Sequence, residues 1–125
     1  RWALTMFSAP STYSLAVKVV GTGHIYVGSG AGTYYYRYYL SAWQTTDFTG
    51  FVQVGDEVTV MDYSRSEADT AGWYDEGTVD GMLEVTVPSG AFLVLKLRGT
   101  CWTSGAGVGI GYVTSNLKFY VLPKL

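Results

Sequence analysis

The chain contains one histidine, His24, and one cysteine, Cys101, and this scarcity limits the chemistry that it can perform. A Ser-His-Asp or Cys-His arrangement would have to use His24, which lies in GTGHIYVG without the G-x-S-x-G turn that presents a nucleophilic serine. Zinc and iron sites usually take several histidine or cysteine ligands. We therefore expect no catalytic triad, no zinc or iron site and no disulfide within the chain.

Carboxylates are the second group of residues with chemical potential. Asp69, Asp75, Glu76 and Asp80 lie near Trp73 in residues 64–81, a polar stretch that reads SRSEADTAGWYDEGTVDG. Two acids at a fixed separation across a cleft hydrolyse glycosidic bonds. A small glycosidase would need Asp75 and Glu76 for turnover, but a single β domain with acids in a polar loop is a weak scaffold for that reaction. We expect no enzyme.

Several carboxylates in one segment also suit a hard cation such as calcium. Asp62, Asp69 and Asp80 are the candidate ligands, although their spacing does not match an EF-hand loop. A solvated acidic loop explains the same residues. Our expectation is therefore no required cofactor, with calcium as the alternative.

Aromatic side chains give the strongest functional signal, because four Trp and eleven Tyr exceed what a small core needs. Tyr and Trp combine a flat apolar face with a polar handle, which suits the flat C–H patches and hydroxyls of sugars. The run from Trp73 through Tyr74 and Asp75 to Glu76 has the composition of a sugar platform. We expect Trp73 and Tyr74 to stack on a saccharide, and Asp75, Glu76 and Asp69 to hydrogen-bond its hydroxyls.

Two further aromatic regions have competing explanations. Trp43, beside Gln44, is a secondary saccharide candidate, and Trp102 is another, but core packing would account for both. Residues 33–43 read TYYYRYYLSAW, with Tyr34, Tyr36 and Tyr38 on one face of the expected strand and Tyr35, Arg37 and Tyr39 on the other. Both faces are amphipathic, so the period does not tell which one faces the core. Sheet packing or a subunit contact would explain such a strand.

The elements that position these residues are β-strands. Apolar residues alternate with polar ones in many short runs, and no run has a sustained helical period. Strands are expected at 13–20, 24–27, 33–43, 51–54, 57–63, 82–87, 91–98 and 116–122, with a short one near 73–78 and another ending at Val113. Residues 64–81 are otherwise expected to form a long loop, which in a compact domain is usually functional or mobile. Short strands separated by turn signals predict an all-β antiparallel sandwich or jelly roll of about seven to nine strands.

Length and charge bound the remaining classes. The 125 residues predict one domain, 1–125, and the start at Arg1 instead of Met predicts a fragment or processed part of a longer protein. The apolar share of 48% argues against disorder, and no apolar run is long enough for a transmembrane helix. A net charge of −2 argues against nucleic acid. All ten acids lie between Asp47 and Glu84 with Arg65 as the only base there, so acid–base pairing with the flanks or an acidic binding edge is expected.

The chain resembles, in style and not in a specific motif, the receptor-binding tip domains of bacteriophage tail fibres. The resemblance lies in the small all-β character, the Gly/Ser/Thr-rich turns, the many tyrosines, and phrases such as LEVTVPSGAFLVLKLRG at 83–99 and SNLKFYVLPKL at 115–125. It implies a homotrimer on a virion surface that binds cell-surface saccharide. No functional residue can be transferred from it.

These observations lead to one principal hypothesis and one alternative. The principal hypothesis is a non-catalytic, extracellular or virion-surface module that binds carbohydrate, associates with itself, and neither binds nucleic acid nor inserts into a membrane. The alternative is a structural or assembly domain of a capsid, tail or surface layer, in which the tyrosine-rich faces make protein–protein contacts.

Overall fold

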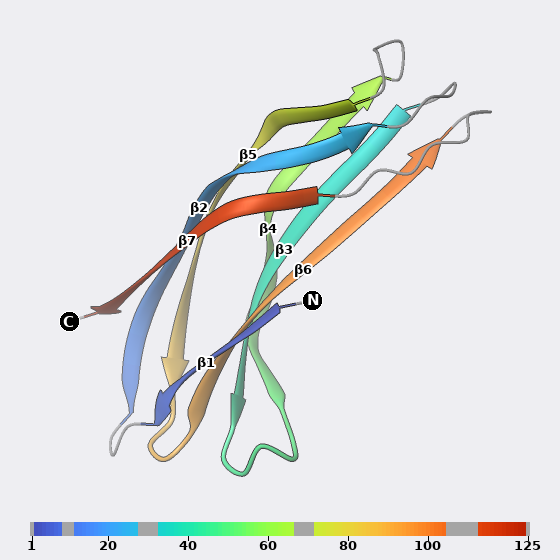
Figure 1. Ribbon diagram of the computed structural model, residues 1–125. Helices are drawn as coiled ribbons and strands as arrows, with labels where there is room; N and C mark the ends of the chain where they lie inside the picture. Colours follow the sequence, from blue (N-terminus) through green and yellow to red (C-terminus); the bar gives the residue numbers. More distant parts are fainter. Residues whose placement is uncertain (1, 9–11, 28–32, 67–71, 105–112, 125) are drawn as a thin grey trace.

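The protein is a sandwich of two antiparallel β-sheets. The computed structural model describes residues 2–8, 12–27, 33–66, 72–104 and 113–124, which contain seven strands and no helix. The strands are β1 (Trp2–Ser8), β2 (Tyr13–Val27), β3 (Thr33–Thr45), β4 (Val52–Ser66), β5 (Gly72–Val87), β6 (Phe92–Ser104) and β7 (Val113–Lys124). They form a sheet A of order β1-β6-β3-β4 and a sheet B of order β5-β2-β7 (Figure 1). The predicted all-β class is confirmed.

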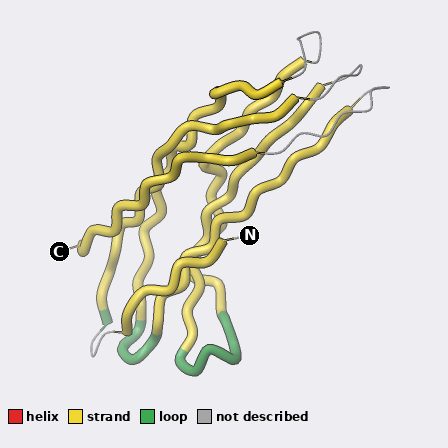
Figure 2. Tube along the Cα trace, viewed as in Figure 1, coloured by secondary structure: helices red, strands yellow, loops and turns green. Residues whose placement is uncertain are grey.

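The connections between these strands tie the two sheets together. Only β3 and β4 are neighbours both in sequence and within a sheet, and each other connection leads from one sheet to the other. The loops at 46–51 and 88–91 lie at the same end of the sandwich (Figure 2). Because nearly every pairing joins segments that are distant in sequence, neither sheet is a local unit of the chain.

The core lies between the sheets and follows the two-residue alternation of the strands. Alternating apolar residues of β2, β5 and β6 are buried, and those of β7 are partly buried against them. The alternating buried residues of β2, β5 and β6 are Leu15, Val17, Val19, Leu83, Val85, Val87, Leu93, Leu95 and Leu97. Lys96 and Arg98 alternate with the leucines of β6 and lie on its outer face.

The ambiguous tyrosine strand, β3, is resolved by the opposing sheet. Tyr34 and Tyr36 are 3% and 0% exposed, so their face is the core face, and Tyr35 and Arg37 lie on the outer face. The Tyr36 hydroxyl donates a 2.8 Å hydrogen bond to the backbone carbonyl of Tyr26 on β2. A buried hydroxyl needs a partner, and this one finds it across the core, in the other sheet.

The long loop predicted at 64–81 is wrong. Residues 64–66 end β4 and residues 72–81 belong to β5, while 67–71 lie outside the described residues. Several predicted short strands are also parts of longer ones, because β2 continues to Val27 and β4 runs through from Val52 to Ser66. The strand β1, which pairs with β6, was not predicted.

A β-bulge hides β5 from a periodicity search. Thr22 lies opposite Thr78, but His24 lies opposite Asp75, so two residues of β5 face one of β2. Gly77, within the bulge, has a φ of 87°, which a residue with a side chain rarely adopts. The extra residue reverses the alternation, so Trp73 lies on the outer face although Val79, six residues on, is buried.

A second bulge, in β4, interrupts the alternation of that strand. Val60 and Met61 are adjacent and would ordinarily point to opposite faces, but both are 3% exposed. Tyr38 lies opposite Met61 and Tyr39 opposite Thr59, so Val60 is the inserted residue. Consecutive residues can then both face the core at this point.

Candidate functional site

Trp73 lies on the outer face of sheet B, with 43% of its surface exposed. Its ring stacks on His24 with a centroid distance of 4.5 Å and an interplanar angle of 4°. Its edge meets Tyr26 at 5.2 Å and 63°. We call His24, Tyr26 and Trp73 the Trp73 cluster. Contacts on both neighbours fix the indole plane while leaving part of it open to solvent.

Tyr74 does not share this surface. Adjacent residues of a strand point to opposite faces of the sheet, and Tyr74 packs partly buried against the core. The guanidinium of Arg65 lies 3.7 Å from the centre of its ring. Trp73 and Tyr74 therefore do not present one common platform, and the stacking role expected for both is available on the outer face to Trp73 alone.

The acidic residues predicted to assist Trp73 are only partly placed. Asp75 lies opposite His24 in the pairing of β2 with β5, and Glu76 is at the β5 bulge. The side chains of these two residues, and the whole of Asp69, lie outside the described parts of the structure. The strand pairing thus places the backbone of Asp75 beside His24 of the Trp73 cluster.

The outer face of sheet A carries a second exposed aromatic group. Trp102 is 40% exposed and stacks on Tyr35 at 5.1 Å and 11°. Arg37 lies 5.0 Å from the Trp102 ring centre, and its Nε donates a 2.9 Å hydrogen bond to Asp62 Oδ1. We call Tyr35, Arg37, Asp62 and Trp102 the Trp102 group. The bond to Asp62 raises the pKa of Arg37 above its ordinary value.

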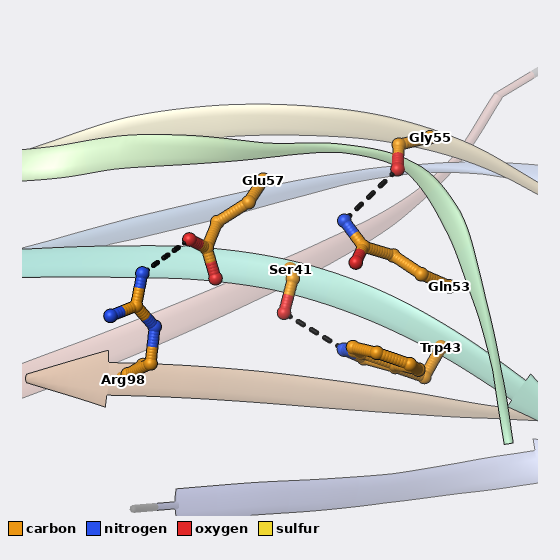
Figure 3. A network of polar contacts seen from close by, with 6 residues as sticks. All are labelled: Ser41, Trp43, Gln53, Gly55, Glu57 and Arg98. Carbon is orange, nitrogen blue, oxygen red and sulfur yellow. Dashed lines mark hydrogen bonds and ion pairs between the residues drawn. The ribbon is translucent and has the colours of Figure 1, made fainter.

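A similar arrangement follows along the same face. Arg98 lies 4.2 Å from the ring centre of Tyr39, and its Nη2 donates a 2.6 Å hydrogen bond to Glu57 Oε1 (Figure 3). We call these three residues the Tyr39 group. The hydrogen bond to Glu57 raises the pKa of Arg98 above its ordinary value.

The third arrangement surrounds Trp43. Its Nε1 donates a 2.9 Å hydrogen bond to Ser41 Oγ (Figure 3), and Lys96 Nζ lies 5.2 Å from its ring centre. We call Ser41, Trp43 and Lys96 the Trp43 group. Trp43, Phe51, Val94 and Lys96 line an open hollow of about 280 Å³ with mostly apolar walls.

The candidate residues Trp43 and Trp73 therefore do not form one site. Trp43 is near the end of β3 in sheet A, close to the loop at 46–51. Trp73 is the second residue of β5 in sheet B, and β5 begins at the other end of the sandwich (Figure 1). The sequence contained no sign of this separation. The Trp102 and Tyr39 groups also went unpredicted as units, because their partners Asp62, Glu57 and Arg98 come from strands distant in sequence.

The carboxylates proposed for calcium lie apart. Asp62 forms an ion pair with Arg37 on the outer face of sheet A, and Asp80 forms a 3.2 Å ion pair with Lys18 on sheet B. Asp69 lies outside the described residues. Within the described ranges, no three His, Cys, Asp or Glu side chains come together as a metal site would need. These pairs join acids of the central segment to bases of the flanks, which is the charge pairing expected from the sequence.

Sheet B also exposes an apolar surface away from the Trp73 cluster. Met82, Tyr120 and Leu122 are 55%, 49% and 61% exposed. Met82 and Tyr120 flank Lys18 from either side in the pairing of β5, β2 and β7. We call Met82, Tyr120 and Leu122 the Met82 face.

Comparisons with protein-family models, with curated proteins and with solved structures found no match for this chain. Among the residues described, no helix is long and apolar enough to cross a membrane. The assignment of function therefore depends on the geometry of the exposed groups.

Proposed function

We propose that the protein is a non-catalytic binding module that recognises cell-surface saccharide through the Trp73 cluster, in the manner of a viral or phage receptor-binding tip at a virion surface or cell exterior. The observation that carries the proposal is the exposure of Trp73 on the outer face of sheet B, with its ring held by His24 and Tyr26. A rigid, amphipathic aromatic ring offers contact area at a low cost in conformational entropy.

The neighbourhood of the cluster supports a polar, hydroxyl-rich ligand. His24 is part of the stack, and Asp75 lies opposite it across the strand pair, so hydrogen-bonding groups accompany the apolar ring. The described carboxylates Asp62, Glu57 and Asp80 are engaged by basic side chains. These ion pairs occupy the three carboxylates with partners in the fold, which favours a structural role for them over a catalytic one.

A glycan-array screen, run with and without calcium and followed by tryptophan fluorescence on each hit, tests the proposal. A saturable hit that perturbs the emission is expected. Trp73→Ala should weaken that binding by about 1–3 kcal/mol in a protein that remains folded. Trp102→Ala is the matched control, because Trp102 is similarly exposed but lies on the other sheet. Unchanged affinity in folded Trp73→Ala would remove Trp73 from the site.

The Met82 face favours a second candidate function, in which the module assembles with other copies. Large apolar side chains gathered on one sheet face are typical of interaction surfaces, and a symmetric interface would cover them. The homotrimer implied by the tail-fibre resemblance is one such assembly. Oligomeric state, measured by sedimentation, tests this candidate without reference to sugar binding.

A further inference from the structure

The three groups on the outer face of sheet A differ in charge. In the Trp102 and Tyr39 groups, an arginine lies against an aromatic ring and also bonds a carboxylate of β4, Asp62 at 2.9 Å or Glu57 at 2.6 Å. In the Trp43 group, Lys96 lies against the ring, but the β4 residue opposite Trp43 is the neutral Gln53. Lys96 has no ion pair with any acid in the described part of the chain. One cation of the three thus lacks a carboxylate.

The surface beside Lys96 is an open hollow with mostly apolar walls. The hollow of about 280 Å³ has walls from Trp43, Phe51 and Val94, with Lys96 as its charged member. The bond from Trp43 Nε1 to the buried Ser41 fixes the plane of the indole. Gln53, opposite Trp43, donates its amide to the Gly55 carbonyl at 3.2 Å (Figure 3).

We infer that this hollow binds an acidic monosaccharide unit, whose ring would stack on Trp43 and whose carboxylate would pair with Lys96. The carboxylate would complete in the Trp43 group the aromatic–cation–carboxylate arrangement that Asp62 and Glu57 complete in the other two. The volume lies just below the range of about 300–1,000 Å³ typical of small-molecule sites, which suits one sugar ring. This site lies on the opposite sheet from the Trp73 cluster and does not depend on the function proposed for it.

Titration of the intact chain with glucuronate, followed by two-dimensional amide NMR, tests the inference. Saturable shifts are expected at the Trp43 indole N–H and at Val94 and Phe51. Glucose, which lacks the carboxylate, and acetate, which lacks the ring, should each bind at least about tenfold more weakly, as expected when a charged contact or the apolar contact is lost. Rising salt should weaken glucuronate binding, because the ion pair is open to solvent.

Variants of Lys96 distinguish the loss of its charge from a loss of the folded structure. Lys96→Met keeps the length of the side chain and should reduce glucuronate affinity about tenfold, whereas Lys96→Arg should retain most of it. Lys18→Met, which removes a lysine from sheet B, should leave the affinity unchanged. Trp73→Ala should also leave it unchanged, so failure of the Trp73 proposal and failure of this one are distinguishable.

Three results would overturn the inference. They are the absence of saturable glucuronate binding by the wild-type chain, equal binding of acetate and glucuronate, and unchanged affinity in Lys96→Met with a native-like amide spectrum. In the first case the Trp43 hollow has no acidic sugar ligand, and in the second it attracts only the ion.

Discussion

Tyr36 shows how much a single side chain contributes to joining the sheets. It is fully buried on β3, and its hydroxyl reaches the Tyr26 carbonyl on β2. Its ring also lies near Tyr63, with centroids 6.4 Å apart. The residue therefore supplies both apolar packing and the one polar contact that its burial requires.

Removal of this hydroxyl should destabilise the protein without disrupting the core. Tyr36→Phe keeps the ring but loses the hydrogen bond to Tyr26, so the free energy of unfolding should fall by about 1–2 kcal/mol. Urea unfolding followed by circular dichroism measures the change. Tyr120→Phe is the control, because Tyr120 is 49% exposed and should give almost no change. Equal effects of the two substitutions would contradict the role of the buried bond.

The stability of the protein at alkaline pH should also depend on Tyr36. Burial, with smaller contributions from Cys101 and Tyr34, raises the pKa of Tyr36 to about 12. The native state therefore holds this proton more tightly than the unfolded chain, whose tyrosines titrate near 10. Its contribution to stability is complete below about pH 10 and is lost as the pH rises through about 12.

The pH dependence of unfolding measures this effect. Wild-type stability should decline between about pH 10 and 12, and Tyr36→Phe should show a shallower decline. Some decline should remain in the variant, because burial also raises the pKa of Tyr13. An identical slope in both proteins would show that Tyr36 does not titrate in this range.

At the scale of the element, β5 is the strand on which the candidate site depends. Its bulge at Gly77 places Trp73 outside, and Gly81, further along, allows β4 to approach closely. A Cβ at Gly81 would clash with Cγ1 of Val60 and would force the two strands apart. The glycines that make β5 resemble a loop in sequence are the residues that let it pack as a strand.

Gly81→Ala should accordingly destabilise the sandwich by roughly 1–3 kcal/mol, the usual cost of overpacking. Adding Val60→Ala should relieve part of that cost, so that the double variant is less destabilised than the sum of the single variants by at least about 0.5 kcal/mol. Urea unfolding of all four proteins completes the cycle. Gly50→Ala, with nothing within 4 Å of its added Cβ, is the control. Strict additivity would exclude a steric conflict between residues 60 and 81.

For the whole molecule, the two outer faces have different surface chemistry. Sheet A exposes aromatic rings bordered by arginine–carboxylate pairs, whereas sheet B combines the Trp73 cluster, the ion pair of Lys18 with Asp80, and the apolar side chains of the Met82 face. Cys101 is exposed on β6. In the receptor-binding tip that we propose, the exposed aromatic groups would contact the ligand and the Met82 face would contact other copies.

Charged substitutions on the Met82 face should lower the oligomeric state if that face joins copies. Met82→Lys combined with Leu122→Lys places a charge at two exposed positions, so folding should be nearly unaffected while a desolvated contact becomes unfavourable. Sedimentation velocity should show a shift toward monomer at equal protein concentration. Thr86→Lys, exposed on the same strand as Met82, is the control. A wild-type chain that is monomeric at every concentration would contradict the assembly role.

Much of the architecture was predictable because strand alternation is local. The inward residues of β2, β6 and β7 follow from a two-residue period that the chain carries in itself, and so does the all-β class. The concentration of aromatic residues likewise led from the sequence to the hypothesis of surface recognition, which stays a prediction. Charge pairing between the acidic segment and the basic flanks was also visible in the sequence.

Only the tertiary structure decided what depends on pairs of strands. A bulge is a mismatch between two partners, so neither the outward position of Trp73 nor the inward position of Met61 can be read from one strand. Which face of the tyrosine strand is buried depends on where the second sheet lies. The separation of Trp43 from Trp73, and the lysine at Trp43 without a carboxylate, arise because strands distant in sequence meet in one sheet.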